Sequence, residues 1–388
     1  MIYRTKPGNN EPLSLLGFGA MRLPTLADHP GIVDEEQSTR LIRHAIDNGV
    51  NYIDSAYTYF EGGSEEAIAK ALRDGYGERV NVATKLPSMR LRDASEHDEY
   101  LETSLRRLER SQIDYYLLHG MKERYWPVIQ SCKTIDFLEK KRSEGLIRNI
   151  GFSYHGESFE LFREILDAGS WDFVQIQFNY MDEHIQAGVK GLQYAASKGL
   201  PVIIMEPLKG GKLAAGFPPA IDALWQKFRV KRSPAEWGLR WVASHPEVSV
   251  ILSGMNKMEQ VEENLAALSG TDTDWITQGD KAVIGEISAE YAKLIKYPCT
   301  GCAYCRAGCP QSIDIPLCIS IVNEGAMFNN QGHAAFEINH YMRQPPSTCV
   351  ECGQCEDVCP QHLHIIDIMK EIATEYEDIA QQWWREYV

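Results

Sequence analysis

Short apolar runs alternate with amphipathic stretches from residue 14 to about residue 268 of the chain. Each apolar run has the length of a buried strand, and the stretch after it has the apolar spacing of a helix. Connections of this length favour parallel strands with right-handed crossovers. Eight such repeats predict an α/β fold, a closed (β/α)8 TIM barrel over residues 1–270. The eight runs cover residues 15–21, 52–56, 80–86, 113–119, 147–153, 173–178, 202–206 and 248–253.

An open doubly wound sheet is the alternative fold, but no Gly-x-Gly-x-x-Gly follows the first strand. One helix start is well marked, because Ser233 precedes Pro234 and stands three residues before Glu236. We expect residues 271–298 to form a linker and one helix. Residues 299–388 differ in composition and predict a small, mainly helical domain with a C-terminal helix that contains Trp383 and Trp384.

Eight of the ten cysteines lie in two runs of identical spacing, Cys-x2-Cys-x2-Cys-x3-Cys-Pro. In bacterial two-cluster ferredoxins this spacing makes the fourth cysteine of each run a ligand of the other run's cluster. The domain is therefore expected to be ferredoxin-like and to hold two [4Fe–4S] clusters. One cluster is assigned to Cys299, Cys302, Cys305 and Cys359, and the other to Cys349, Cys352, Cys355 and Cys309.

A pair of zinc sites is the alternative for these cysteines. Zinc needs two Cys-x2-Cys pairs rather than two identical runs of four, so it is disfavoured. Cys132 and Cys318 lie outside the runs, and Cys318 stands in an apolar stretch where cysteine packs as a small hydrophobe. The clusters could transfer single electrons or could be purely structural, and the sequence leaves both interpretations open.

Charge and composition restrict the partners. The chain has 39 Lys and Arg against 54 Asp and Glu, a net charge of −15. Nucleic acid is not an expected partner, because phosphate binding needs an excess of cations. The N-terminus lacks the apolar core of a signal peptide, and no apolar run has the length of a membrane span. We therefore expect a cytoplasmic protein without a membrane partner.

Four polar residues stand at or just beyond the ends of three consecutive predicted strands: Asp54, Tyr59, Lys85 and His119. Side chains at the carboxyl ends of barrel strands meet at one mouth, where the chemistry of such barrels takes place. A carbonyl that accepts a hydride also needs a proton. Tyrosine could donate it if a neighbouring ammonium lowers the phenol's pKa, with a carboxylate holding the lysine and a histidine orienting the carbonyl.

Residues 1–268 resemble an aldo-keto reductase. The resemblance rests on residues 16–24 (LGFGAMRLP), on Asp54-x4-Tyr59 with residues 63–65 (GSE), and on Lys85 and His119 at the other two catalytic positions. It implies hydride transfer between a nicotinamide cofactor and an aldehyde or ketone, or its alcohol. In this family's pattern Tyr59 is the acid/base, Lys85 tunes it, Asp54 holds Lys85, and His119 orients the carbonyl.

The same resemblance implies a set of cofactor contacts, with departures at three positions. Tyr154 replaces an asparagine, Met205 replaces the aromatic that stacks on nicotinamide, and Gln260 replaces the cation that binds the 2′-phosphate. Both NADP(H) and NAD(H) therefore stay open as the cofactor. The implied contacts are Ser153, Gln175, Met205, Pro207, Leu208, Gly210, Ser253, Gly254, Lys257, Glu263 and Asn264.

The whole chain resembles aldo-keto reductases that carry a C-terminal ferredoxin domain. The leading hypothesis is an oxidoreductase that acts on a small carbonyl or alcohol substrate and exchanges single electrons with a ferredoxin or another external carrier. Nicotinamide moves two electrons together and clusters move one, and no flavin motif is visible to bridge them. One alternative is a ferredoxin-fed reductase without nicotinamide. Another is a non-catalytic docking module for an electron carrier.

Overall fold

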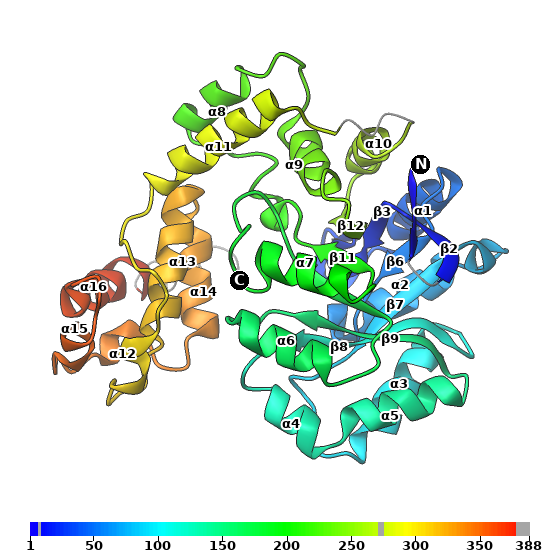
Figure 1. Ribbon diagram of the computed structural model, residues 1–388, viewed down its shortest axis with the longest axis horizontal. Helices are drawn as coiled ribbons and strands as arrows, with labels where there is room; N and C mark the ends of the chain where they lie inside the picture. Colours follow the sequence, from blue (N-terminus) through cyan, green and yellow to red (C-terminus); the bar gives the residue numbers. More distant parts are fainter. Residues whose placement is uncertain (7–8, 271–274, 378–388) are drawn as a thin grey trace. The chain divides into compact units, whose positions relative to one another are not determined.

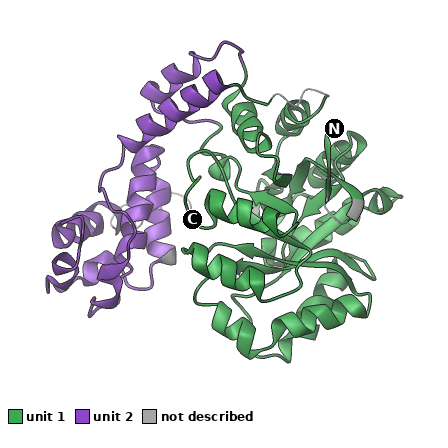
Figure 2. Cartoon of the chain, viewed as in Figure 1, with its two compact units in different colours: residues 1–214, 232–277 green, residues 215–231, 278–388 purple. Residues whose placement is uncertain are grey.

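The computed structural model describes residues 1–6, 9–270 and 275–377 (Figure 1). Contacts divide the chain into two compact units (Figure 2). The first unit comprises residues 1–214 and 232–277, and the second comprises residues 215–231 and 278–388. A segment from within the barrel's stretch of sequence thus belongs by its contacts to the second unit. Residues 271–274 of the predicted linker, and Trp383 and Trp384 of the predicted tail, lie outside the described residues.

The first unit contains a closed barrel of eight parallel strands, which confirms the predicted fold. The strands follow one another around the barrel in chain order, and the last pairs with the first. All eight predicted apolar runs form barrel strands. They are β3 (Leu16–Gly19), β6 (Tyr52–Asp54), β7 (Asn81–Leu86), β8 (Ile113–Met121), β9 (Ile147–Tyr154), β10 (Phe173–Gln177), β11 (Val202–Met205) and β12 (Val248–Gly254).

The helices that follow these strands start where the sequence offers capping groups. Ser233 caps its helix as predicted, because its hydroxyl accepts the N–H of Glu236 at 3.0 Å. Asp34 and Ser158 cap their helices in the same way. The helices of this unit are α1 (Glu35–Asp47), α2 (Gly63–Ala71), α3 (Glu96–Arg107), α4 (Trp126–Ser131), α5 (Thr134–Ser143), α6 (Phe159–Asp167), α7 (Gly188–Ser197), α9 (Pro234–Ala243) and α10 (Met258–Ala267).

Inward-facing aromatic and branched side chains fill the barrel, so it is a packed core and not a channel. Tyr115 packs edge-on against Tyr52 and Phe173, with ring centroids 5.0 and 5.1 Å apart. Gly151 makes room for this cluster, because a Cβ there would lie 2.6 Å from the Phe173 ring. The chemistry is therefore confined to the ends of the strands.

An N-terminal hairpin, which the eight apolar runs do not predict, is formed by β1 (Tyr3–Lys6) and β2 (Asn9–Ser14). Leu13 from this hairpin joins the apolar cluster inside the barrel. The Arg4 guanidinium donates to the carbonyls of Ala243 at 2.6 Å and His245 at 2.9 Å. The hairpin therefore closes the end of the barrel where the strands begin. A second hairpin, β4 (Thr25–Leu26) with β5 (His29–Val33), follows the first barrel strand.

The second unit is helical around its own apolar core. The Lys227–Glu286 ion pair, at 2.6 Å, joins the segment that carries α8 (Pro219–Trp225) to α11 (Gln278–Ala292). The Asn323 side chain accepts the N–H of Tyr297 at 2.9 Å and donates to its carbonyl at 2.7 Å, which fixes the chain entering the cysteine region. The helices are α8 (Pro219–Trp225), α11 (Gln278–Ala292), α12 (Tyr304–Ala307), α13 (Ile315–Met327), α14 (Gln331–Tyr341), α15 (Gln354–Asp357) and α16 (Ile365–Ile372). No helix of the described residues combines the length and the apolar character needed to cross a bilayer.

Candidate functional site

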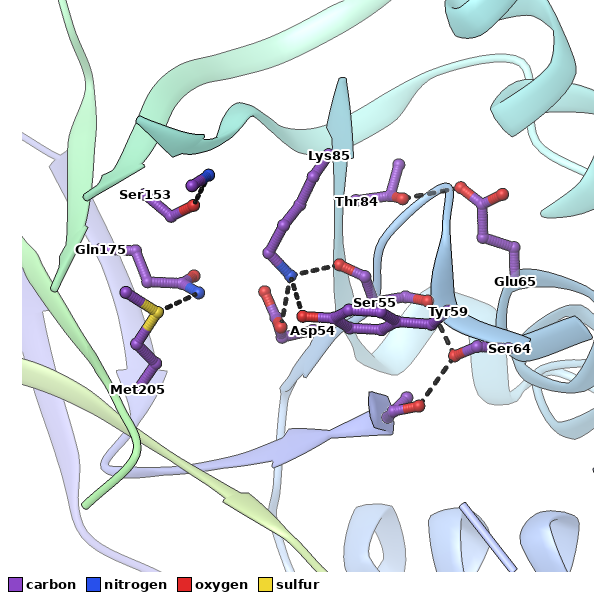
Figure 3. Close-up of polar contacts among 12 residues, drawn as sticks. Asp54, Ser55, Tyr59, Ser64, Glu65, Thr84, Lys85, Ser153, Gln175 and Met205 are labelled. Carbon is purple, nitrogen blue, oxygen red and sulfur yellow. Dashed lines mark hydrogen bonds and ion pairs between the residues drawn. The ribbon is translucent and has the colours of Figure 1, made fainter. Parts of the chain in front are cut away.

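The four predicted catalytic residues meet at the carboxyl end of the barrel. Figure 3 shows three of them, Asp54, Tyr59 and Lys85, with Lys85 between the other two. The Lys85 ammonium donates to Asp54 Oδ1 at 2.6 Å, to the carbonyl oxygen of Ser55, and to the Tyr59 hydroxyl at 3.4 Å. The His119 ring lies edge-on to the Tyr59 ring, with centroids 5.8 Å apart. The lysine is therefore held by two oxygens and directed at the phenol.

Burial controls the protonation of this group. It raises the pKa of Tyr59 above its usual value, and the opposing effect of Lys85 is smaller. The expectation that the lysine gives Tyr59 a lowered pKa is therefore wrong in its net direction, because loss of solvation disfavours the phenolate more than the ammonium favours it. The pKa of His119 is lowered well below its usual value by burial and by Lys85. At neutral pH we expect a neutral phenol and a neutral imidazole.

The loop that carries Tyr59 is pinned by several hydrogen bonds. Buried Glu65 accepts from Thr84 Oγ1 at 2.6 Å and from Arg107 Nη1 at 3.1 Å. Arg107 also donates to the carbonyls of Tyr57 and Glu61. Gly62 has a φ of 104°, and a Cβ there would lie 2.3 Å from the Arg107 guanidinium carbon. The loop therefore holds Tyr59 in place before any substrate arrives.

A second line of hydrogen bonds ties this loop to neighbouring strands. The Ser55 and Ser64 hydroxyls are 2.8 Å apart, and Ser64 donates to the carbonyl of Ala20 at 3.0 Å (Figure 3). Residues 63–65, which carry the family resemblance in the sequence, thus contact residues before the loop and residues on the next strand, since Ser64 bonds to Ser55 and Glu65 bonds to Thr84. Their role in the structure is to position the phenol.

The residues expected at the nicotinamide end lie on strands next to the catalytic group. Gln175 donates from Nε2 to the sulfur of Met205 at 3.6 Å (Figure 3). Its Oε1 is buried and has no hydrogen-bond partner among the described residues, so it is an acceptor for an amide N–H. Ser153 accepts the N–H of Gly120 at 2.7 Å and donates to the carbonyl of Leu118 at 3.3 Å. Tyr154 points away from the mouth, and its hydroxyl donates to the Ser158 carbonyl at 2.5 Å.

The residues expected at the adenosine end follow β11 and β12. Asn264 donates to the Ser253 hydroxyl at 2.9 Å. Gln260 Oε1 accepts the backbone N–H groups of Asn256 and Lys257, at 2.9 and 3.2 Å. The amide oxygen of Gln260 is thus used to cap α10. The expected contact Glu263 is exposed on the same helix.

The expected phosphate loop, with Pro207, Leu208 and Gly210, follows β11. A Cβ on Gly210 would lie 2.9 Å from Arg22 Nη2, and one on Gly254 would lie 3.3 Å from Arg22 Cδ. The Arg22 side chain therefore lies against both glycines. It is absent from the contacts expected from the sequence, although residues 16–24 carry part of the resemblance. A guanidinium beside two glycines is suited to bind a pyrophosphate.

The cysteines form two groups in the second unit, each taken from both runs. One small cavity is lined by Cys299, Cys302, Cys305 and Cys359, and another by Cys309, Cys349, Cys352 and Cys355. These are the two sets that the spacing predicts. Within the described ranges, no three His, Cys, Asp or Glu side chains converge on a single ion. The other two cysteines, Cys132 and Cys318, are buried.

The two runs share a backbone conformation as well as a spacing. The residue directly before the second cysteine is left-handed in both, Gly301 with φ 69° and Glu351 with φ 58°. The residue after the second cysteine is also left-handed, Ala303 with φ 61° and Gly353 with φ 78°. Such turns direct successive N–H groups inward, and the Gly301 N–H approaches the Cys299 sulfur at 3.4 Å. The loops thus fit a sulfur-rich, negatively charged cluster.

The fold and the two sites together define a barrel oxidoreductase with an attached iron–sulfur domain. The model of the aldo/keto reductase family matches residues 15–275, and that of the 4Fe-4S dicluster domain matches residues 298–364. The chain belongs to the aldo/keto reductase family, which confirms the predicted family and the predicted class of enzyme.

Related proteins agree with this assignment. The chain is 26% identical to an L-galactose dehydrogenase of Arabidopsis thaliana, over 74% of this chain and 93% of that protein. It is 27% identical to an NADH-specific methylglyoxal reductase of Escherichia coli, over 66% and 90%. A solved aldo-keto reductase from Klebsiella pneumoniae in complex with NADPH superposes with a TM-score of 0.60 at 25% identity, over 74% and 96%.

Proposed function

We propose that the chain interconverts a small aldehyde or ketone and its alcohol with a nicotinamide cofactor, and that two [4Fe–4S] clusters in its second unit exchange single electrons with an external carrier. The observation that carries the proposal is the Lys85 ammonium, which lies between Asp54 at 2.6 Å and the Tyr59 hydroxyl at 3.4 Å. When bound, nicotinamide supplies or accepts hydride, and the clusters carry electrons one at a time.

The side chains at the barrel mouth would handle the proton. In the reducing direction Tyr59 donates its hydroxyl proton to the substrate's carbonyl oxygen, and the phenolate that forms is stabilised by Lys85. Asp54 keeps Lys85 charged and in place. His119 is neutral, so it can donate one N–H to the same carbonyl oxygen and polarise it without giving up a proton. In the oxidising direction the phenolate takes the alcohol proton.

The residues present fit a dinucleotide without a 2′-phosphate better than one with it. Gln175 offers a buried acceptor to the carboxamide, and Arg22 lies beside the expected pyrophosphate position. At the adenosine end α10 carries Glu259, Glu262 and Glu263, and the cation beside them is Lys257. A phosphate dianion there would meet more negative than positive charge. We therefore expect NADH to be preferred over NADPH.

The cysteine sets would hold the clusters as the spacing indicates. Cys299, Cys302, Cys305 and Cys359 would ligate one, and Cys309, Cys349, Cys352 and Cys355 the other. Cys302 and Cys352 are exposed, which gives each cluster an edge within reach of a redox partner. A ferredoxin or similar small carrier is the partner class that fits one-electron exchange at such an edge.

The test is an anaerobic titration of the purified protein, with iron and sulfide counted beforehand. NADH and NADPH are added separately, while cofactor binding and the broad cluster absorbance are followed. We expect tighter binding of NADH and bleaching of the clusters, since one NADH that becomes NAD⁺ and a proton releases two electrons, one for each cluster. Turnover is then measured with a panel of carbonyls that includes methylglyoxal, and Tyr59→Phe should lower it by roughly 10²- to 10⁴-fold. Unchanged turnover in this variant would refute the proposed mechanism.

One feature favours the second candidate, a ferredoxin-fed reductase that does not use nicotinamide. Met205 occupies the position of the stacking aromatic, and its sulfur is engaged by Gln175 at 3.6 Å. If neither NADH nor NADPH binds, while a reduced ferredoxin supports turnover, this candidate replaces the first. Tight binding of either nucleotide would exclude it.

A further inference from the structure

A second histidine lies at the mouth of the barrel beside His119. The backbone N–H of His155 donates to the carbonyl of Met121 at 2.9 Å, just past the end of β9. A Cβ on Gly120, the residue after His119, would lie 3.6 Å from His155 Cδ2. Ser153 faces the barrel mouth, and alternation places His155 on the same side. The two imidazoles therefore flank Gly120.

Strand register places Lys122 next to this histidine. Met121 pairs with Tyr154 in the parallel ladder of β8 and β9, so the residues that follow them, Lys122 and His155, are neighbours across the two strands. Burial, the larger cause, and the charge of Lys122 lower the pKa of His155 to about 4, against the opposing effect of a hydrogen bond with the Gln186 side chain. His155 is thus neutral at pH 7 and can donate one N–H.

The Lys122 ammonium is half-buried and makes no hydrogen bond or ion pair with the residues that the structure describes. Two carboxylates attract the ammonium, those of Glu123 and Glu157, and both side chains are exposed to solvent. Glu123 is exposed and accepts the backbone N–H of Glu157 at 2.8 Å. Arg124 donates to the Tyr125 hydroxyl at 2.5 Å and lies over its ring. A partly desolvated cation whose counter-charges are exposed carboxylates, without a direct ion pair, gains stability when an anion binds it directly.

The other polar groups at the barrel mouth do not occupy the positions of Lys122 and His155 that would face a substrate. Buried Asp182, which follows β10, is neutralised by Lys209 at 2.9 Å. It also accepts from Gln177 at 2.7 Å and from Asn179 at 3.0 Å. On the other side, His119 Nδ1 is buried and has no partner within the described part of the chain. The mouth therefore offers a neutralised carboxylate, two imidazoles and an ammonium that forms no ion pair within the described part of the chain.

We propose that Lys122 and His155 form an anion subsite, and that the substrate carries a carboxylate or a phosphate beside or near its carbonyl group. This inference rests on the proposed function, since it places the reacting carbonyl at Tyr59 and His119. The anionic group then lies one strand further along the mouth, with Lys122 supplying charge and His155 supplying an N–H. A 2-oxo acid, or a phosphorylated aldehyde or ketone, has this chemistry. These two residues bind the substrate and take no part in proton transfer.

Binding is tested by calorimetry on the anaerobic protein with its clusters and saturating NADH, using oxamate and inorganic phosphate as probes. Loss of a hydrogen bond to a charged group corresponds to roughly 10- to 100-fold in affinity. We expect that loss in Lys122→Met and His155→Asn. Lys190→Met, which removes an exposed charge from α7, should bind like the wild type. Tyr59→Phe should also retain anion binding.

Turnover provides a second readout with matched substrates. Pyruvate is compared with methyl pyruvate, and glyceraldehyde 3-phosphate with glyceraldehyde. The charged member of one pair should have the higher kcat/KM. Lys122→Met should abolish that preference, and the control Lys190→Met should retain it. If oxamate binds and pyruvate is preferred over methyl pyruvate, the substrate is a 2-oxo acid. If inorganic phosphate binds, the substrate is a phosphorylated aldehyde or ketone.

The two proposals fail in different ways. If neither probe binds, or if Lys122→Met binds both as tightly as the wild type, the anion subsite is wrong. A preference for the neutral substrates would also overturn it. If the probes bind as expected but no carbonyl is reduced with either nucleotide, the subsite stands and the nicotinamide-linked function fails.

Discussion

The buried ion pair between Lys85 and Asp54 allows the sharpest prediction. The lysine side chain is 1% exposed and the aspartate 5%, and their charged atoms are 2.6 Å apart. At an effective dielectric constant of 20, two charges at that distance attract by about 6 kcal/mol. Desolvation of both groups offsets much of this attraction. Lys85→Met removes the attraction and leaves Asp54 buried without its cation, so we expect the free energy of unfolding to fall by about 3–5 kcal/mol.

The double variant Asp54→Asn with Lys85→Met tests the cause. It removes the uncompensated charge as well, so it should regain at least half of the lost stability. The Ser55 carbonyl loses its donor in both variants, which keeps the recovery incomplete. Urea unfolding of the barrel is followed by tryptophan fluorescence, with Lys190→Met as the control. The reasoning is refuted if Lys85→Met unfolds within about 1 kcal/mol of the wild type, or if the double variant is no more stable than the single one. Turnover should be lost in both.

Three further predictions follow from the sites. Burial raises the pKa of Tyr59, and a raised pKa keeps the acid protonated to higher pH, so the reduction rate should stay level from about pH 6 to about pH 9. Since His119 has a lowered pKa, an inflection near its ordinary pKa in the pH profile of kcat would contradict this assignment. Cys302→Ser should reduce the iron content from about eight to about four atoms per chain. Cys318→Ser, at a buried cysteine outside the runs, should leave the iron content unchanged. If both variants lose the same amount of iron, the assigned ligand sets are excluded. Gly62→Ala places a Cβ 2.3 Å from the Arg107 guanidinium carbon, so it should displace the Tyr59 loop and lower kcat. Gly75 also has a positive φ, but the space around it is open. The control Gly75→Ala should therefore leave kcat unchanged.

The grouping of residues 215–231 with the second unit has a structural consequence. The chain passes between the two units three times, directly after Ala214, before Arg232 and after Thr277. The first passage follows the loop of Gly210 by a few residues. The loop expected to contact the cofactor is therefore joined through a short stretch of chain to the iron–sulfur unit. An exchange of residues 215–231 for a short glycine linker would show whether the two sites depend on this connection.

Local pattern alone determined much of this protein. The eight barrel strands could be found because each is a continuous apolar run, buried on both faces by its place in a parallel barrel. The two cysteine runs could be interpreted because cluster ligation depends on short-range spacing. Asp54, Lys85 and His119 were visible because polar residues interrupt or end apolar runs at a fixed edge of the barrel.

Tertiary structure decided what depends on burial and on contacts between distant segments. The pKa of Tyr59 could not be given the correct direction from the sequence, because the sequence shows the neighbouring lysine and not the loss of solvent. Arg22 meets Gly210 and Gly254 only once the barrel closes. Lys122 and His155 are 33 residues apart and become neighbours through the register of β8 and β9, which side-chain alternation along either strand does not reveal.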